Sequence, residues 1–389
     1  MSAVTATIAL PRVLRVGGGC SAELADVLGS AGLGRPLIVT DGFLAAQPFL
    51  ARILRGLDGA GIAAEVFSDV RPDPTTDSID RAVQLVRRGD FDCVVGIGGG
   101  SPMDTAKAVA LLGSLGGEMR DYRAPVLTDR PTLPLIAIPT TAGSGSECTR
   151  FTIITDSATD EKMLCAGLAF LPTIALVDYE LTMAMPARLT ADTGVDALVH
   201  AIEAFVSRRA NPFTDDLALT AMRTLFTNLR TVYGDPGDEQ ARAAMMLGAT
   251  QAGIAFSNSS VALVHGMSRP IGAHFHVAHG LSNAMLMPSV TEFSVAEGVD
   301  RYAGCARALD LAGPDLPDAE AARRLVGGLA RLNRDLDVPG PRQYGIPEDR
   351  WRERIPVMAA QAKASGSPEH NPRVPSVAEI AELYHTLWH

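Results

Sequence analysis

The sequence predicts an α/β domain with a parallel sheet, followed by an all-helical domain. Between residues 36 and 141, short runs rich in Val and Ile alternate with amphipathic helical stretches, a pattern typical of parallel strands joined by helices that cover both faces of the sheet. After about residue 186 the strand-like runs stop and long amphipathic segments take over. A chain of 389 residues is also longer than one hydrophobic core usually accommodates. We therefore expect two domains, residues 1–186 and 187–389.

The individual elements follow from the same periodicity. In the first domain, strands are expected in PLIVT (36–40), AAEVFSD (63–69), CVVGIGGGS (93–101) and LPLIAIPTT (133–141), and helices in 47–61 and 76–89. In the second domain, residues 216–233 and 238–256 have helical periodicity, whereas 364–376 is rich in Gly, Ser, Pro and Asn and predicts a loop.

Composition excludes several classes of protein. The formal net charge of −10 and the pI near 5.3 give no general attraction to nucleic acid or to an anionic membrane. No segment has about 20 uninterrupted apolar residues, and the first residues lack the basic start of a signal peptide. The five cysteines include no CxxC pair, which argues against a disulfide or zinc framework. We expect a cytoplasmic protein.

A glycine-rich loop follows the third predicted strand. Gly98, Gly99, Gly100 and Ser101 lead directly into a helical pattern with Pro102 in its first turn. Glycines let the backbone approach a phosphate, and a helix N-terminus offers free N–H groups. We interpret this loop as a phosphate-binding site, with Ser101 capping the helix or binding the phosphate; a plain capped helix is the alternative. The cluster Gly17–Gly19 resembles part of a dinucleotide fingerprint, but a tight strand-to-helix turn is the preferred interpretation.

Polar residues also follow the next strand and continue into the helix after the glycine loop. The turn from Pro139 to Glu147 is rich in hydroxyl groups and small residues, as expected of a ligand-contacting loop at the carboxyl end of a parallel sheet. Asp104 and Lys107 are three residues apart and share one helix face, so a structural ion pair would explain them without a ligand. Only three lysines occur among 34 basic residues, Lys107, Lys162 and Lys363; we interpret them as positions where Arg is unsuitable, with chance as the alternative.

Four potential metal ligands lie in two short neighbourhoods of the second domain. Asp196 and His200 are separated by one helical turn, and His265 and His279 follow further along the chain. One carboxylate and three imidazoles suit a first-row divalent ion. His274 and His276 are rival ligands. We expect the metal to lie between the domains and to face the nucleotide, because such interfaces favour small-ligand sites.

Five motifs occur in one order along the chain: GGGSPMDTAKAVA (98–110), IPTTAGSGSECT (138–149), TGVDALVHAIEAF (193–205), VHGMSRPIGAHFHVAHG (264–280) and NPR (371–373). Together they resemble the iron-containing alcohol dehydrogenases. The resemblance implies a Rossmann-like domain, a helical metal domain, a bound NAD and often a homodimer. It implies Fe(II), or in some members Zn(II), as the metal, with Asp196, His200, His265 and His279 as its ligands. It also implies cofactor contacts from the glycine loop and from Asp104, Thr140, Thr141, Thr149 and Lys162.

The chain departs from this family at one position near the third ligand. Many members have a further His one helical turn after it, and here that position is Arg269, followed by Pro270. A proton relay through that His is therefore not expected. Pro270 disfavours helical geometry at Arg269, so the helix could bend there. A guanidinium suits a carboxylate or phosphate on the far end of a substrate; a structural ion pair or a solvent-facing side chain is the alternative.

The expected reaction is hydride transfer between NAD(H) and a small primary alcohol or aldehyde, including a short hydroxy acid or its semialdehyde. Asp41, directly after the first strand, is expected to bind the adenosine ribose and so favour NAD over NADP, unless it only caps the next helix. Three other functions remain open: a maleylacetate-reductase-like enzyme, a lyase like dehydroquinate synthase, and a non-redox metal-binding hydrolase.

Overall fold

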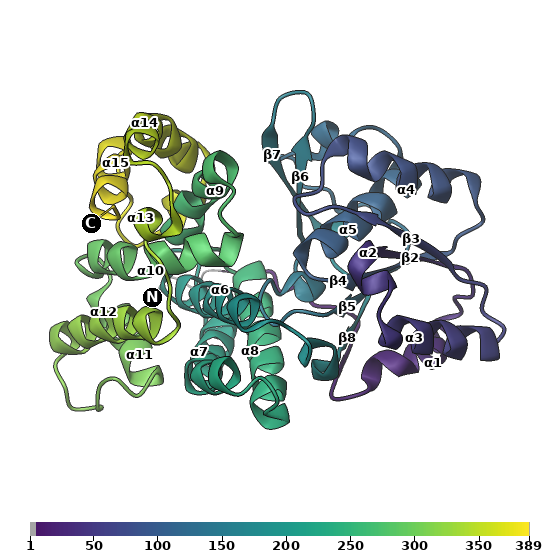
Figure 1. Cartoon of the computed structure of the whole chain (residues 1–389), viewed down its shortest axis with the longest axis horizontal. Helices are drawn as coiled ribbons and strands as arrows, with labels where there is room; N and C mark the ends of the chain where they lie inside the picture. Colours follow the sequence, from purple (N-terminus) through teal and green to yellow (C-terminus); the bar gives the residue numbers. More distant parts are fainter. Residues whose placement is uncertain (1–4, 389) are drawn as a thin grey trace. The chain divides into compact units, whose positions relative to one another are not determined.

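The computed structural model describes residues 5–388, and the chain forms two compact units. The first unit comprises Ile8–Ala184 and contains both sheets; the second comprises the chain from Met185 onwards together with residues 5–7, and its regular elements are helices. The predicted fold class, an α/β domain with a parallel sheet followed by an all-helical domain, is thereby confirmed (Figure 1).

The main sheet of the first unit has six strands, all parallel, in the order β1-β8-β5-β4-β2-β3. The four predicted strands are present, and two four-residue strands that the sequence did not reveal complete the sheet. The strands are β1 (Val13–Val16), β2 (Pro36–Asp41), β3 (Glu65–Val70), β4 (Cys93–Gly98), β5 (Leu135–Pro139) and β8 (Ile174–Val177).

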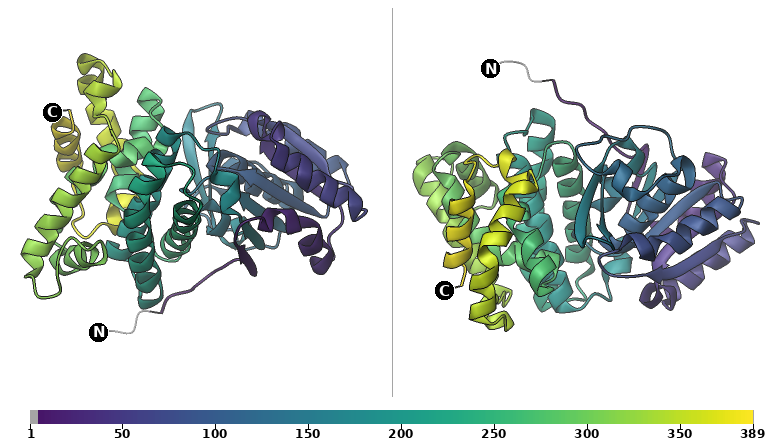
Figure 2. Two further views of the ribbon diagram at one scale, coloured as in Figure 1. Left: turned by 60° about the horizontal axis from the view of Figure 1, so that its bottom comes forward. Right: turned by 90° about the horizontal axis from the view of Figure 1, so that it is seen from above.

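Helices cover both faces of this sheet because its strands are apolar on both sides (Figure 2). Alternate residues point to opposite faces, so Leu37 and Val39 of β2 enter one core while Ile38 enters the other. The first core contains side chains of α4 (Thr76–Arg88) and α5 (Gly100–Leu115), and the second those of α1 (Leu24–Ala31) and α3 (Pro48–Gly59). A single turn, α2 (Gly42–Ala45), follows β2.

A separate antiparallel hairpin was not expected from the sequence. It consists of β6 (Phe151–Asp156) and β7 (Glu161–Ala166), which pair from Phe151–Ala166 to Asp156–Glu161. The segment between the strands, Ser157–Asp160, is polar, and Asp160 has a positive φ of 54°. The sequence signal was therefore present as a short polar turn between two alternating runs.

The second unit is built around α6 (Ala187–Val206), which is buried along most of its length and packs against α7, α8 and α10. Helix α9 continues through Pro270 to Phe275, so the expected bend at Arg269 does not end the helix. The predicted loop 364–376 contains one short 3₁₀ turn, η6 (Ser367–His370). The remaining helices are α7 (Pro212–Gly234), α8 (Glu239–Ser257), α9 (Leu263–Phe275), α10 (His279–Val295), α11 (Val299–Ala308), α12 (Asp318–Asp335), α13 (Pro341–Tyr344), α14 (Glu348–Ala364) and α15 (Val377–Thr386).

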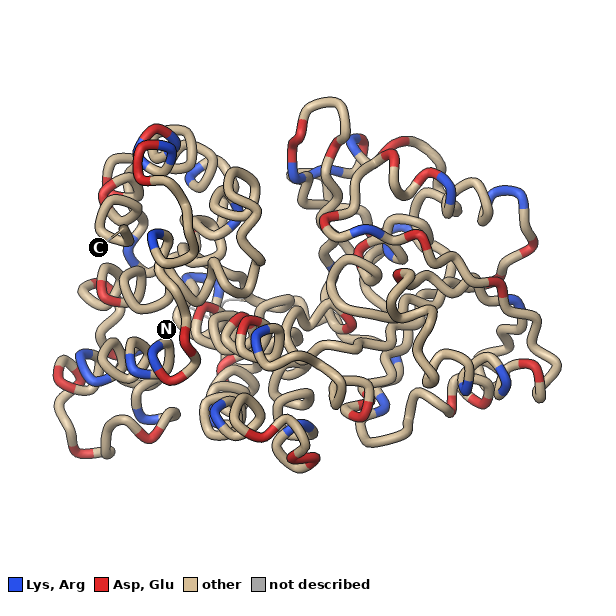
Figure 3. The backbone as a smooth tube through the Cα atoms, in the orientation of Figure 1, with Lys and Arg blue, Asp and Glu red and all other residues tan. Residues whose placement is uncertain are grey.

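Charged residues of both signs are interspersed along the helices of each unit (Figure 3). None of the helices within residues 5–388 combines the length and apolarity needed to cross a bilayer.

Candidate metal centre and nucleotide loop

One face of α6 carries three buried polar residues. Asp196, His200 and Glu203 stand at positions i, i+4 and i+7, so their side chains project from the same side of the helix. Their neighbours along α6 are almost all apolar and buried. Since burying a carboxylate is costly without partners, this face must be matched by groups from other helices.

A glycine brings the start of α10 against this face. A Cβ atom at Gly280 would lie 2.2 Å from the backbone oxygen of Asp192 and 3.3 Å from Cβ of Asp196. Only glycine permits so close an approach. His279, the first residue of α10, is thereby placed beside Asp196, and its side chain remains 48% exposed.

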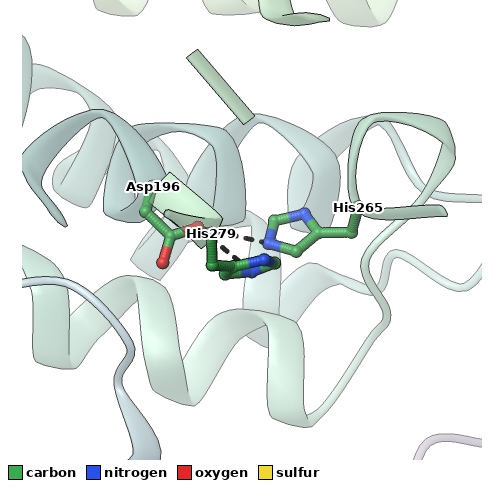
Figure 4. Close-up of side chains that lie close together, drawn as sticks. All are labelled: Asp196, His265 and His279. Carbon is green, nitrogen blue, oxygen red and sulfur yellow. Dashed lines mark ion pairs between the residues drawn. The ribbon is translucent and has the colours of Figure 1, made fainter. Parts of the chain in front are cut away.

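His265 from α9 completes a group of three donors (Figure 4). Asp196 Oδ1 lies 3.4 Å from His265 Nε2 and 3.7 Å from His279 Nε2. One ligand atom from each residue lies within 4.8 Å of the other two. A tetrahedral ion with bonds near 2.1 Å needs donor–donor spacings of about 3.4 Å, so these three residues fit a divalent metal.

His200 lies beside this group without being part of its tightest cluster. Its Nε2 is 3.9 Å from Asp196 Oδ1, and its ring stacks on that of His265 with centroids 4.4 Å apart. The two rival histidines lie elsewhere: His274 Nε2 is 2.9 Å from Gln361 Oε1, and His276 forms the left-handed C-cap of α9. Neither belongs to the donor group found among the described residues.

Glu203, which the sequence analysis missed, connects α6 to α9. Its carboxylate accepts hydrogen bonds from the backbone N–H groups of Ala262 (2.8 Å) and Val264 (2.6 Å), and so caps a helix whose own N-cap residue offers no side-chain bond. Its Oε2 also lies 2.6 Å from His265 Nδ1. Because a carboxylate only accepts, Nδ1 carries a proton, and Nε2 is the nitrogen that faces the site and can bind a metal once its own proton has left.

The buried charges explain the titration of this group. Burial alone would lower the pKa of His265, but the nearby carboxylates of Glu203 and Asp196 outweigh it and raise the pKa to about 9. For Asp196, burial acts to raise the pKa, and the three histidines around it lower it well below the usual range instead. The carboxylates of Glu203 and Asp196 thus stabilise positive charge on His265, and the histidines stabilise the negative charge of Asp196.

Asn283 is a second residue that the sequence analysis missed. Its side-chain Nδ2 lies 2.6 Å from Asp196 Oδ1, 3.2 Å from His265 Nε2 and 3.3 Å from His279 Nε2. It stands one helical turn after His279 on α10, so the i, i+4 spacing was available as a signal. Its bond to Asp196 orients the carboxylate that the three histidines surround.

Arg269 lies on α9 one turn after His265 and is partly buried. Its Nη1 donates to Ser367 Oγ at 3.2 Å, and its buried Nε has no partner among the described residues. No carboxylate of residues 5–388 lies within 4 Å of its guanidinium, so the expected alternative of a structural ion pair is wrong. Burial lowers the pKa of Arg269, with the Glu203 carboxylate opposing that effect.

The glycine loop of the first unit sits at the carboxyl end of β4. Here Gly98 has a φ of +150°, and a Cβ on it would lie 2.4 Å from Pro102, so the turn into α5 requires glycine. The first turn of α5 has no side-chain cap. Strands β2 and β4 are adjacent in the sheet. From β2 the chain continues to β3 on one side, and from β4 it continues to β5 on the opposite side, so the strand order reverses between β2 and β4. In α/β sheets ligands bind at such a switch point.

Two residues of this loop and its helix, Ser101 and Asp104, have hydrogen-bond partners within the protein. Ser101 does not cap α5, because the N-cap is Gly99, and its Oγ accepts from Asp73 N at 3.3 Å. Asp104 accepts from Ile153 N and from Ser146 Oγ, and burial raises its pKa to about 6. These contacts tie α5 to the segment that follows β5.

Lys107 forms no ion pair with Asp104 within 4 Å, contrary to the structural alternative considered for them. Its Nζ donates to Thr149 O and Oγ1 at 3.0 Å and to Phe151 O at 2.8 Å. Burial lowers the pKa of Lys107 to about 8, although the nearby carboxylates oppose this. The buried lysine thus fastens Thr149 to α5.

The remaining predicted cofactor residues surround the ends of β2, β4 and β5. Thr140 N donates to Gly98 O at 3.0 Å, and Thr141 packs against Gly99. Asp41 ends β2 and caps α2 through a bond from Leu44 N to Oδ1. Lys162 on β7 forms an ion pair with Asp73 at 2.8 Å. The tight turn at Gly17–Gly19 is held by Asp178, which accepts from Gly19 N and Ser21 N.

Comparison with known proteins covers nearly the whole chain. Residues 11–179 match the family described as iron-containing alcohol dehydrogenase, and residues 190–388 match the C-terminal part of that family. The chain is 36% identical to the NAD-dependent methanol dehydrogenase of Bacillus methanolicus, over 96% of this chain and 97% of that protein. It is 34% identical to the lactaldehyde reductase of Escherichia coli K12, with the same coverage. A solved 1,3-propanediol oxidoreductase superposes with a TM-score of 0.94 at 31% identity, covering 99% of this chain and all of that one.

These matches, together with the parallel sheet and the helical unit that follows it, identify the chain as an oxidoreductase. The chain belongs to the iron-containing alcohol dehydrogenase family. It is an alcohol dehydrogenase by that membership, in agreement with the function that the motifs predicted.

Proposed function

We propose that this protein interconverts small primary alcohols and aldehydes with NAD(H), using one divalent metal held by Asp196, His200, His265 and His279. The observation that supports this most directly is the convergence of Asp196, His265 and His279 at ligand spacing. A divalent cation bound there supplies Lewis acidity, which polarises an alcohol or carbonyl oxygen. Fe(II) is the proposed metal, with Zn(II) as the alternative.

The protein's own residues prepare this site before any ligand enters. Glu203 keeps the proton of His265 on Nδ1, so that Nε2 is available as a ligand. Asn283 holds Asp196 Oδ1 in place. The exposed side of His279 leaves the site open towards solvent, from which an alcohol can approach.

We propose that the dinucleotide binds at the switch point of the first unit. The uncapped first turn of α5 and the glycines Gly98–Gly100 supply N–H groups for the phosphates. One carboxylate oxygen of Asp41 caps α2, and no donor within residues 5–388 lies at hydrogen-bond distance from the other, which can therefore accept from the ribose hydroxyls. The ammonium group of Lys162 pairs with Asp73 and has further N–H donors for a phosphate, whereas Asp104 and Thr149 act by holding the segment that follows β5 against α5.

The test is a screen of short alcohols and aldehydes with NAD(H) and NADP(H), using protein reconstituted with Fe(II), Zn(II) or Mn(II). We expect alcohol-dependent formation of NADH that requires metal. Asp196→Ala should lose bound metal by elemental analysis as well as turnover, whereas the surface control Asp335→Ala should keep both. Full metal stoichiometry in Asp196→Ala, or no turnover of any alcohol or aldehyde, would contradict the proposal.

We further propose a homodimer in the cytoplasm. The family resemblance supports the homodimer. The five cysteines are buried and form no disulfides, which suits a reducing compartment and supports the cytoplasm. Light scattering coupled to size-exclusion chromatography tests the oligomeric state, and fractionation of cells tests the location.

A further inference from the structure

The partly buried guanidinium of Arg269 has few partners within the protein, and one of its buried donors has none. It offers five N–H donors. Within residues 5–388 only Nη1 has a partner, Ser367 Oγ, and the buried Nε has none. Leaving a buried donor of a charged group unpaired costs about 1–3 kcal/mol or more.

Another buried arginine of the same unit shows how such a group is normally satisfied. Arg242 is 2% exposed and, like Arg269, has no carboxylate partner. Each of its three guanidinium nitrogens nevertheless has an acceptor: Pro236 O, Thr190 Oγ1 and Met185 O. All three nitrogens of the Arg242 guanidinium therefore have a hydrogen-bond partner, whereas within residues 5–388 only one nitrogen of the Arg269 guanidinium does.

The position of Arg269 places its unused donors beside the metal centre. Residues one turn apart on a helix have Cβ atoms about 5–6 Å apart, and long side chains lean back towards the N-terminus. The guanidinium of Arg269 thus extends over the turn that carries His265, and it interacts electrostatically with Glu203, the carboxylate that His265 contacts. The turn η6 packs on the same stretch of α9, since a Cβ at Gly266 would lie 2.8 Å from Pro368.

Glu203 does not neutralise Arg269. Its two oxygens already accept from Ala262 N, Val264 N and His265 Nδ1, and no hydrogen bond or ion pair links it to Arg269. The guanidinium therefore retains a positive charge and free donors next to the site where the alcohol oxygen binds.

We propose that Arg269 and Ser367 form an anion subsite, so that the preferred substrate is a short ω-hydroxy acid or its semialdehyde with a carboxylate at the end remote from the reacting carbon. This inference rests on the proposed function for the reaction itself. The planar fork of Arg binds a carboxylate through two parallel hydrogen bonds, and Ser367 Oγ holds the guanidinium in position.

The experiment compares two substrates of equal length, 4-hydroxybutyrate and 1-butanol, on the metal-loaded enzyme with NAD. We expect the wild type to have the higher kcat/KM for the hydroxy acid. In Arg269→Gln the ratio of kcat/KM for acid to alcohol should fall about 10–100-fold, mostly through KM, the scale of one lost charge-assisted contact. Arg269→Lys should recover part of the ratio because it keeps the charge. Arg324→Gln, which alters an exposed arginine of the same unit paired with Glu320, is the control and should keep the wild-type ratio.

A binding measurement separates this inference from the proposed function. Calorimetric titration of butyrate into the metal-loaded protein should show binding that is at least 10-fold weaker in Arg269→Gln than in the wild type. If no alcohol is oxidised but butyrate binding depends on Arg269, the proposed function fails and the anion subsite stands. If the wild type prefers 1-butanol, or if Arg269→Gln binds butyrate as the wild type does, the anion subsite is refuted.

Discussion

Replacing Glu203 by glutamine tests whether the carboxylate behind His265 prepares the metal centre. The substitution keeps the shape of the side chain but removes its charge and turns one acceptor into a donor. In the native site, Oε1 accepts from Val264 N, and Oε2 accepts from Ala262 N and His265 Nδ1. Whichever way the amide lies, its NH₂ group must face at least one of these N–H groups.

The magnitude follows from the bonds that are lost. One hydrogen bond to a charged acceptor contributes about 1.5–3 kcal/mol. If the lost bond is that of His265, the imidazole is free to move its proton to Nε2 and to rotate. Loss of such a carboxylate behind a histidine ligand weakens metal binding about 10–100-fold, which equals about 1.4–2.7 kcal/mol. The two estimates agree, so we expect a dissociation constant for metal raised 10- to 100-fold.

The assay is a competition between metal-free protein and a chromophoric chelator for Zn(II), with Fe(II) measured under anaerobic conditions. Glu353→Gln, at an exposed position of the same unit, is the matched control and should bind metal as the wild type does. Circular dichroism of the metal-free variants verifies that the fold is retained. An affinity of Glu203→Gln within twofold of the wild type would refute the reasoning, because His265 would then be oriented without its carboxylate.

Three other changes test further parts of the structure. Asn283→Ala removes the donor to Asp196 Oδ1 and should weaken Zn(II) binding about 10-fold, with Asn283→Ser intermediate; equal affinities in the chelator competition would contradict its positioning role. Asp41→Gly removes the carboxylate that repels a 2′-phosphate, so the ratio of kcat/KM for NAD to that for NADP should fall; a wild type without preference for NAD would count against the assignment. Lys107→Met removes the hydrogen bonds that the ammonium group donates to Thr149 O and Phe151 O, so the free energy of unfolding measured in urea should fall by about 3 kcal/mol, and an unchanged midpoint would disprove the role of Lys107 in holding this segment.

Several parts of the protein are encoded locally and could be predicted. The alternation of Val- and Ile-rich runs with amphipathic stretches specifies β2 to β5 and the helices between them, because burial on both faces selects such residues over a few positions. The spacing of Asp196 and His200 places both on one face of α6 from helix geometry alone. The hairpin β6–β7 carried a signal of the same kind, two six-residue strands around a short polar turn, and the sequence analysis overlooked it.

Other features depend on contacts between distant segments, and only the tertiary structure decided them. His265 and His279 join Asp196, whereas His274 and His276 do not, because the close approach at Gly280 and the packing of α9 determine which imidazoles reach α6. Lys107 binds the backbone near Thr149 and not Asp104, its neighbour in sequence.

Glu203 is the clearest example of a residue whose role depends on distant segments of the chain. In the sequence it is one acidic residue within an apolar helix, and its role comes from Ala262, Val264 and His265, about 60 residues further along the chain. Local periodicity reports which side of a helix is buried, and it carries no information on what that side meets. The partner of a buried charge is specified by packing, since the cost of leaving the charge unpaired is met only when the folded chain brings the matching donors to it.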